Sequence, residues 1–410
     1  MKYHIKAPVG LLQSVVRLPA SKSISNRILI LNALSEYPGE VRNLSDSDDT
    51  EVLRQALQSG ASHIDVRAAG TAMRFLTAYL SGRQGRWTLT GTERMKNRPV
   101  KILADALQTL GAQIEYAEKD GFPPLRIDGR RLRGGEVRLD GSVSSQYISA
   151  LLMVAPLMTD GLKLHLTGKL ISKPYLRLTI QLMRRFGVNV LEEGQTFIVL
   201  PQAYAAVPFA VEPDWSAASY WYEMAALSDQ ASIELKGLSA DSLQGDAAIV
   251  SLFGRLGVET VFTSQGVVLG RKARMQPQEM VCDFADIPDM AQTFAVTCAA
   301  LDIPFSFSGL QSLKIKETDR LKALVNELAK FGYKVQERDG CILTWDGSRC
   351  ETPGAPVVAT YEDHRMAMAF APMAMRCAGG IRMADIEVVS KSYPGFWDDL
   401  RTAGFQLSEI

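Results

Sequence analysis

The sequence is poor in the residues that build metal centres and in the glycine-rich motifs that bind nucleotides. Its 410 residues include four histidines and five cysteines, and neither type occurs in a CxxC or HExxH spacing. It also lacks a GxxxxGK[ST] loop and a GxGxxG motif at the start of a helix. These absences disfavour a zinc hydrolase, a nucleoside triphosphate kinase and a Rossmann dehydrogenase. We therefore expect no metal ion and no organic cofactor.

An excess of one charge, long apolar runs and paired cysteines are also missing. Lysine plus arginine and aspartate plus glutamate both number 45, so no overall positive field would attract nucleic acid or a membrane surface. No apolar run reaches the roughly 18 residues of a membrane span, and the first residues, MKYHIK, lack a signal-peptide core. The odd number of cysteines argues against a disulfide framework. We expect a cytoplasmic monomer that acts on small molecules, with neither nucleic acid nor membrane as a partner.

The chain does contain a pattern that recurs six times. Each time a helical stretch ends on a glycine and passes into a short alternating strand, such as Gln113–Tyr116 or the segment that starts at Lys334. Glycine suits the position after a helix because it adopts a left-handed turn without strain. The six glycines are Gly60, Gly111, Gly187, Gly257, Gly332 and Gly404. Their recurrence predicts an internal structural repeat.

A second set of helical stretches alternates with the first. These stretches are rich in Ala, Leu, Met and Phe on nearly every face, which is typical of buried helices. They span residues 22–34, 71–80, 145–157, 217–227, 289–301 and 363–375. The six units divide into three and three, so we expect two α/β domains with ligands in the cleft between them. The expected domains are residues 14–212, and residues 213–410 together with 1–13.

Polar and cationic residues gather where the buried helices of the first half begin. Lys22, Ser23 and Arg27 combine a hydroxyl with two cations at one helix start, where unpaired backbone N–H groups favour an anion. Similar groups recur at the other helix starts of this half: Gly70, Arg98, Ser144, Ser145, Gln146, Ser172 and Tyr175. Each segment alone is typical of an ordinary capped helix with solvated charges. Their repetition favours an anion site.

The second half adds carboxylates to the same arrangement. Asp289 stands at the head of an apolar helix, and Glu317 lies in the charged run Lys314–Arg320. A carboxylate among buried cations is suited to proton transfer. The accompanying cations are Lys316, Arg320, Arg365 and Lys391. Helix capping by Asp289 and a solvated first turn at Glu317 are the structural alternatives.

In order along the chain, these motifs resemble the 5-enolpyruvylshikimate-3-phosphate synthase family, the 3-phosphoshikimate 1-carboxyvinyltransferases of aromatic amino acid biosynthesis. The resemblance rests on SKSISNR, AGTAMR, RMKNRP, DGSVSSQ, SKPY, IPD, KETDRL, DHRMAM and the late Lys391. It implies the α/β, two-domain enolpyruvyl transferase fold, with three βαβαββ repeats and buried helices in each domain. It also implies transfer of the enolpyruvyl group of phosphoenolpyruvate to the 5-hydroxyl of shikimate 3-phosphate, with release of phosphate.

The resemblance also implies roles for individual residues. Shikimate 3-phosphate would be held by Lys22, Ser23, Arg27, Ser144, Ser145, Gln146, Ser172, Tyr175, Asp289 and Lys316. Phosphoenolpyruvate would be held by Lys22, Gly70, Arg98, Gln146, Arg320, Arg365 and Lys391. Asp289 and Glu317 would transfer protons, as base and acid in an order that stays open, with Lys22 and Lys391 as helpers.

The sequence departs from the family pattern near Gly70, and two alternatives remain open. Ala68 replaces the usual asparagine, Phe75 replaces the usual proline, and Ser312 stands where asparagine is common. One alternative is a related transferase acting on UDP-N-acetylglucosamine, but that family uses a cysteine in the first half, where this chain has none. The other is an anion-binding protein without catalysis, which would gain nothing from the two carboxylates.

Overall fold

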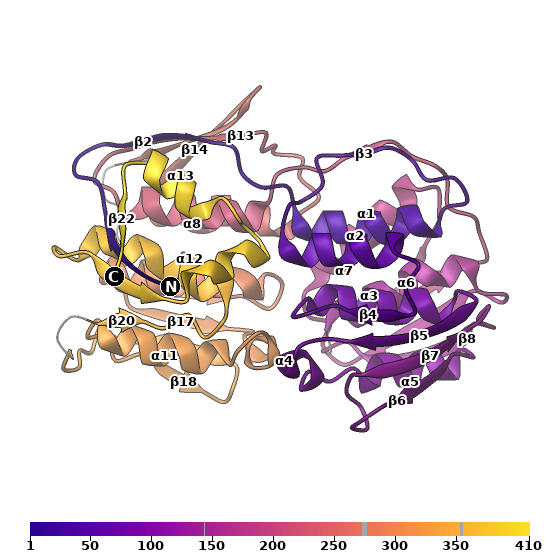
Figure 1. Cartoon of the computed structure of the whole chain (residues 1–410). Helices are drawn as coiled ribbons and strands as arrows, with labels where there is room; N and C mark the ends of the chain where they lie inside the picture. Colours follow the sequence, from indigo (N-terminus) through magenta and orange to yellow (C-terminus); the bar gives the residue numbers. More distant parts are fainter. Residues whose placement is uncertain (143, 273–276, 353–355) are drawn as a thin grey trace. The chain divides into compact units, whose positions relative to one another are not determined.

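The computed structural model describes residues 1–142, 144–272, 277–352 and 356–410. The chain divides into two compact units. We call Ala20–Val211 the N-terminal unit, and Met1–Pro19 with Glu212–Ile410 the C-terminal unit. Figure 1 labels many of the helices and strands of both units.

Five four-stranded sheets of the described residues follow one topology, in which the first and second strands are parallel and the third and fourth are antiparallel. In each sheet the spatial order is first, second, fourth, third. The N-terminal unit has two such sheets: β4 (His63–Asp65), β5 (Gly85–Thr90), β6 (Gln113–Tyr116) and β7 (Leu125–Gly129); and β8 (Gly135–Asp140), β9 (Leu162–Thr167), β10 (Leu191–Glu193) and β11 (Thr196–Val199). Alternating side chains, as in β9, explain why one face of each sheet is buried.

The C-terminal unit has three sheets of the same kind. They consist of β2 (Leu12–Val16), β13 (Ala231–Lys236), β14 (Val258–Thr263) and β15 (Gly266–Arg271); of β16 (Met280–Asp283), β17 (Phe305–Ser308), β18 (Gln336–Arg338) and β19 (Ile342–Trp345); and of β20 (Val357–Val358), β21 (Ile381–Ala384), β22 (Gln406–Glu409) and β1 (Lys2–Lys6). In the last sheet the fourth strand comes from the start of the chain, because β1 lies between β21 and β22. The strand expected from Lys334 starts two residues later, at Gln336.

The first of the six repeats is reduced. Its sheet consists of β3 (Val41–Arg42) and β12 (Phe209–Ala210), which run parallel, and the described residues add no hairpin to it. The strand that follows Gly60 is β4, which belongs to the next sheet. The predicted boundary after residue 13 also differs from the structure. It would cut β2, whose residues Leu12–Val16 pair with β13, and the N-terminal unit begins only at Ala20.

The six helices expected to be buried are present in the two units. They are α1 (Lys22–Leu34), α3 (Gly70–Ser81), α6 (Ser145–Val154), α8 (Trp215–Leu227), α10 (Ala291–Ala300) and α12 (His364–Phe370). Most of their residues are buried, although the last three residues of α1, 32–34, are only partly buried. Three of them are shorter than expected, because Pro156, Pro288 and Pro372 lie in adjoining 3-10 turns, and proline lacks the N–H that an α-helix interior needs.

The remaining helices include those that end at the repeated glycines. The glycines have φ between 63° and 102°, as a left-handed turn requires, so the predicted helix ends are confirmed. These helices are α2 (Asp48–Gln58), α5 (Lys101–Thr109), α7 (Lys173–Arg185), α9 (Ile249–Gly254), α11 (Arg320–Lys330) and α13 (Phe396–Thr402), and α4 (Glu93–Lys96) adds a single turn.

Glu223 is an acidic residue inside the core of the C-terminal unit. It is fully buried in α8, and neither carboxyl oxygen has a hydrogen-bond partner among the described residues. Burial raises the pKa of Glu223 well above its usual value, and the nearby Thr297 hydroxyl offsets this only partly. The folded protein therefore holds Glu223 protonated over a pH range in which the unfolded chain is ionised.

We expect the free energy of unfolding of Glu223→Gln to increase relative to that of the wild type as the pH rises above about 4.3, the usual glutamate pKa. The native pKa is the higher one, so the wild type loses stability with rising pH until that pKa is reached, by at most about 1.4 kcal/mol per pH unit. Urea unfolding of both proteins at pH 5 and pH 8 measures the effect. The exposed Glu115→Gln variant, on β6, is the control. A difference that does not change with pH would contradict the assignment.

Candidate active site

The C-terminal unit contains a buried arginine that holds three carboxylates. Arg320, the first residue of α11, has a side chain only 2% exposed. Its Nη1 donates to Asp289 Oδ1 at 2.8 Å, and its Nη2 donates to Glu317 Oε2 at 2.9 Å. Asp363 accepts two further hydrogen bonds, from Nε at 2.7 Å and from Nη2 at 3.3 Å. The two carboxylates predicted to transfer protons thus share one guanidinium group.

Three more cations surround these carboxylates. Lys316 Nζ lies 3.6 Å from Asp289 Oδ1, and Arg365 Nη2 donates to Asp289 Oδ2 at 3.4 Å. Lys391 Nζ lies 3.8 Å from Glu317 Oε1. The structure therefore brings together all six of the site residues expected in the second half of the chain. Asp363 completes the group as the cap of α12, where its Oδ1 accepts from the Arg365 backbone N–H at 2.9 Å.

The ionisation of Asp289 depends on these neighbours. Burial would raise the pKa of Asp289, but Lys316, Arg365 and Arg320 outweigh burial and hold that pKa well below its usual range. Burial also lowers the pKa of Lys316, with Asp289 acting against that change. Asp289 is therefore a carboxylate at neutral pH. It is a weak base as long as no bound anion engages the cations that face it.

In the N-terminal unit, Arg27 is a buried cation with neutral partners. It is 3% exposed, and its hydrogen bonds go to Thr179, Ser149 and the backbone carbonyls of Ser23 and Tyr175. Burial lowers the pKa of Arg27 to about 10, so the group stays charged at neutral pH. A buried charge without a counter-ion is costly, and a bound anion would compensate it.

Lys22 stands at the start of α1, one turn before Arg27. Its Nζ lies 3.2 Å from Asp49 Oδ2 in α2. The Asp49 side chain is 5% exposed, so this ion pair is largely shielded from water. Ser21 occupies the cap position of α1, but its buried hydroxyl makes neither a capping bond nor any other hydrogen bond to the residues that the structure describes.

Gly70 and Arg98 lie against each other at the start of α3. A Cβ added to Gly70 would come within 2.5 Å of Arg98 Nη1 and 2.6 Å of Arg74 Nη1. Only glycine therefore leaves room for two guanidinium groups beside this helix start. The Arg98 Nε is buried and has no hydrogen-bond partner among the described residues.

The hydroxyls and the amide expected in the site lie on α6 and α7. Ser144 caps α6 by accepting from the Gln146 backbone N–H at 3.4 Å, and Ser145 is the first residue of that helix. The Gln146 side chain donates to Thr71 of α3 at 3.1 Å. Ser172 precedes α7 in a left-handed conformation, with φ of 54°, and its side chain makes no capping bond. Backbone strain of this kind is frequent at ligand sites.

Asp49 and Asp363 are charged neighbours of the site residues, and neither was predicted to belong to the site. The position of Asp363 before His364 and Arg365 signals a helix cap, but nothing in the sequence pairs it with Arg320. The pairing of Lys22 with Asp49 joins α1 to α2 and likewise depends on packing.

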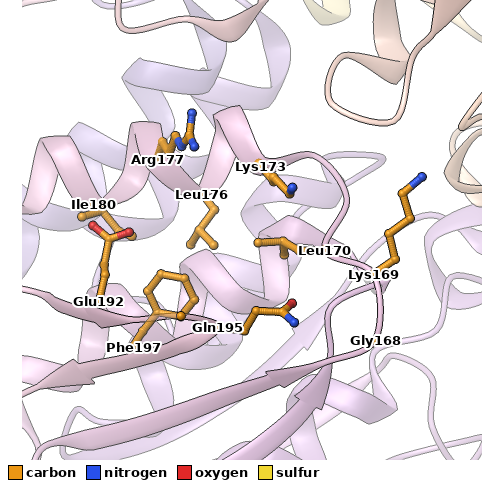
Figure 2. Close-up of a pocket in the computed structure, with 11 residues that line it drawn as sticks. Gly168, Lys169, Leu170, Lys173, Leu176, Arg177, Ile180, Glu192, Gln195 and Phe197 are labelled. Atoms are coloured by element: carbon orange, nitrogen blue, oxygen red, sulfur yellow. The ribbon is translucent and has the colours of Figure 1, made fainter.

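A cavity of about 410 Å³ lies elsewhere in the N-terminal unit, between α7 and β10–β11. Figure 2 shows Leu176 of α7 and Phe197 of β11 on opposite sides of it. None of the predicted site residues lines this cavity, so it does not correspond to the predicted substrate site.

Among the described residues, no helix combines the length and the apolar character needed to cross a membrane. Within the same residues, histidine, cysteine, aspartate and glutamate side chains form no group of three or more that could share a metal ion.

The repeated sheets around buried helices, with cations and carboxylates at the helix starts, define an α/β enzyme that acts on anionic substrates. The family model described as EPSP synthase (3-phosphoshikimate 1-carboxyvinyltransferase) matches residues 6–61 and 52–400. The chain belongs to this family, whose members transfer an enolpyruvyl group in aromatic amino acid biosynthesis. The predicted family, fold class and type of reaction are confirmed.

Individual relatives agree with this assignment. The chain is 56% identical to a 3-phosphoshikimate 1-carboxyvinyltransferase of Bacteroides fragilis (strain YCH46). The 408 aligned residues cover 99% of both chains. It is 35% identical to the enzyme of that name from Vibrio vulnificus (strain YJ016), over 98% of both chains. The solved EPSP synthase of Acinetobacter baumannii has the same fold, with a TM-score of 0.77 at 20% identity over the full length of both chains.

Proposed function

We propose that the cationic, hydroxyl and carboxylate groups described above bind shikimate 3-phosphate and phosphoenolpyruvate and transfer the enolpyruvyl group from the second substrate to the first. Arg27, with the hydroxyls of α6 and α7, binds the phosphorylated sugar acid. The residues proposed to bind phosphoenolpyruvate are Gly70, Arg98, Arg320, Arg365 and Lys391. Both substrates are multiply charged anions, so their mutual repulsion must be balanced by protein cations.

The observation that carries this proposal is the sharing of Arg320 by Asp289 and Glu317. A base and an acid that contact the same buried guanidinium are held at a fixed distance from each other. Asp289 accepts the proton of the 5-hydroxyl group of shikimate 3-phosphate, while the oxygen of that hydroxyl bonds to C2 of phosphoenolpyruvate. Glu317 supplies a proton to C3. The tetrahedral intermediate then loses a C3 proton, and its carbon–oxygen bond to phosphate breaks. Lys22 and Lys391 assist, and one carboxyl group acts in both steps.

Substrate binding makes Asp289 a better base. The pKa of Asp289 is low because Lys316, Arg365 and Arg320 face it. Phosphate and carboxylate groups that engage these cations weaken their effect, so the pKa of Asp289 rises towards the range of an effective general base. Proton abstraction is thereby coupled to the presence of both substrates.

Phosphate release tests the assignment directly. The protein is supplied with phosphoenolpyruvate and either shikimate 3-phosphate or UDP-N-acetylglucosamine as acceptor. We expect phosphate release only when shikimate 3-phosphate is the acceptor. Release only with the nucleotide sugar would support the related transferase instead, and tight binding of both anions without release would support an anion-binding protein. The proposal also includes a cytoplasmic location and a monomeric state. Size-exclusion chromatography with light scattering tests whether the protein is a monomer.

Gly70→Ala should weaken phosphoenolpyruvate binding with little effect on folding. The added Cβ meets the flexible ends of Arg98 and Arg74, so it displaces guanidinium groups and leaves the backbone in place. We expect KM for phosphoenolpyruvate to rise about tenfold, equivalent to about 1.4 kcal/mol, with an unchanged KM for shikimate 3-phosphate. Steady-state kinetics measure both. Gly82→Ala, at the other end of α3 and with no atom nearer than 3.8 Å, is the matched control. Equal changes in both variants would contradict the assignment.

A further inference from the structure

Arg27 is surrounded by side chains that lie outside the predicted site. Its guanidinium has five N–H groups, and four of them have partners. Nε donates to Thr179 Oγ1 at 2.6 Å, Nη1 to the Ser23 carbonyl at 2.8 Å, and Nη2 to Ser149 Oγ at 3.3 Å and the Tyr175 carbonyl at 3.4 Å. Among the described residues, one N–H on Nη1 is left for a ligand.

Thr179 and Ser149 form an ordered relay of hydrogen bonds behind Arg27. The Thr179 hydroxyl donates its proton to the Tyr175 carbonyl at 3.0 Å, so it can only accept from Arg27 Nε and from Ser149, whose oxygen lies 2.8 Å away. The Ser149 hydroxyl therefore donates to Thr179 Oγ1 and accepts from Arg27 Nη2. Both hydroxyls are fully buried, so water cannot substitute for either of them.

Phe75 restricts the guanidinium from another direction. Its ring is fully buried in α3, and the Arg27 Cζ lies 5.5 Å from the ring centre. An aromatic ring at this distance attracts a guanidinium electrostatically, whereas an aliphatic side chain of similar size would only fill the space. Phe75 is also one of the positions at which this sequence departs from the family pattern.

We infer that Phe75, Ser149 and Thr179 are positioning residues that hold the Arg27 guanidinium with one N–H directed at an anionic ligand. The inference rests on the proposed binding of shikimate 3-phosphate by Arg27. The relay and the ring together leave the planar group little rotational freedom, and this pre-organisation reduces the entropy lost when the ligand binds. None of the three side chains needs to contact the substrate.

Thr179→Val and Phe75→Leu test this inference. Each retains most of the volume of the side chain, but valine removes the hydroxyl and leucine removes the ring. We expect KM for shikimate 3-phosphate to rise about tenfold in Thr179→Val and about threefold in Phe75→Leu. The value of kcat and the KM for phosphoenolpyruvate should stay within about twofold. Thr179→Ser, which keeps the hydroxyl, should restore the wild-type KM.

A double-mutant cycle separates positioning from general destabilisation. In an Arg27→Gln background, Thr179→Val should cause no further rise in KM for shikimate 3-phosphate, because its effect passes through Arg27. A further tenfold rise in that background, or a lower melting temperature with unchanged KM in both single variants, would overturn the inference. If Arg27→Gln itself left KM unchanged, the proposed role of Arg27 would fail, and this outcome is distinct from failure of the positioning residues alone.

Discussion

Glu317→Gln and Asp289→Asn are each expected to lower turnover by about 10²–10⁴-fold, the usual contribution of a proton-transfer group. The amides keep the shape of the carboxylates but neither accept nor deliver a proton at neutral pH. Both residues also contact Arg320, so the geometry of the cluster should largely persist. Shikimate 3-phosphate binding should stay within about tenfold of the wild type, or about 1.4 kcal/mol. Phosphate release gives turnover, and titration calorimetry gives binding.

A neighbouring carboxylate provides the control for both variants. Asp319 caps α11 by accepting from the Lys322 backbone N–H at 3.1 Å. Asp319→Asn should therefore leave turnover close to that of the wild type, because asparagine is also a good cap. Wild-type turnover in both Glu317→Gln and Asp289→Asn would remove the proton-transfer assignment. An equal loss in the Asp319 variant would show that any change of charge in this region affects activity.

Arg320→Met is expected to cost about 3–5 kcal/mol of unfolding free energy and to abolish activity, because three carboxylates lose their shared partner. Methionine fills much of the volume, so the loss reflects uncompensated charge. The effect should shrink in acid. The folded pKa of Asp289 lies below its unfolded value, so its ionised form stabilises the wild type above about pH 4 and this contribution fades as the pH falls. Urea unfolding at pH 7 and pH 2 measures both effects.

Lys322→Met is the matched control for Arg320→Met. Lys322 lies two residues further along α11 and is exposed to water. Its replacement should change the unfolding free energy by at most about 0.5 kcal/mol. A loss below about 1 kcal/mol in Arg320→Met would show that the three carboxylates find other partners and that Arg320 does not hold the cluster together.

The helix starts were predictable from sequence because two local signals coincide there. Polar residues such as Ser144 or Asp289 precede a long apolar stretch, and glycine marks the end of the neighbouring helices. The partners of the charged residues were not predictable in the same way. The contact of Lys22 with Asp49, and that of Arg320 with Asp363, join different helices, so they depend on how the helices pack. The reduced first repeat could not be foreseen either, since β12 reaches β3 from the end of the unit.

The placement of β1 has a consequence for the biosynthesis of the chain. This strand is made before all the other strands described here, but it pairs with β21 and with β22, whose residues Gln406–Glu409 follow those other strands in the chain. The N-terminal unit, by contrast, draws all its strands from one continuous segment that ends at Val211. During translation the N-terminal unit can therefore fold before the C-terminal unit is complete, while β1 remains unpaired until β21 and β22 have left the ribosome.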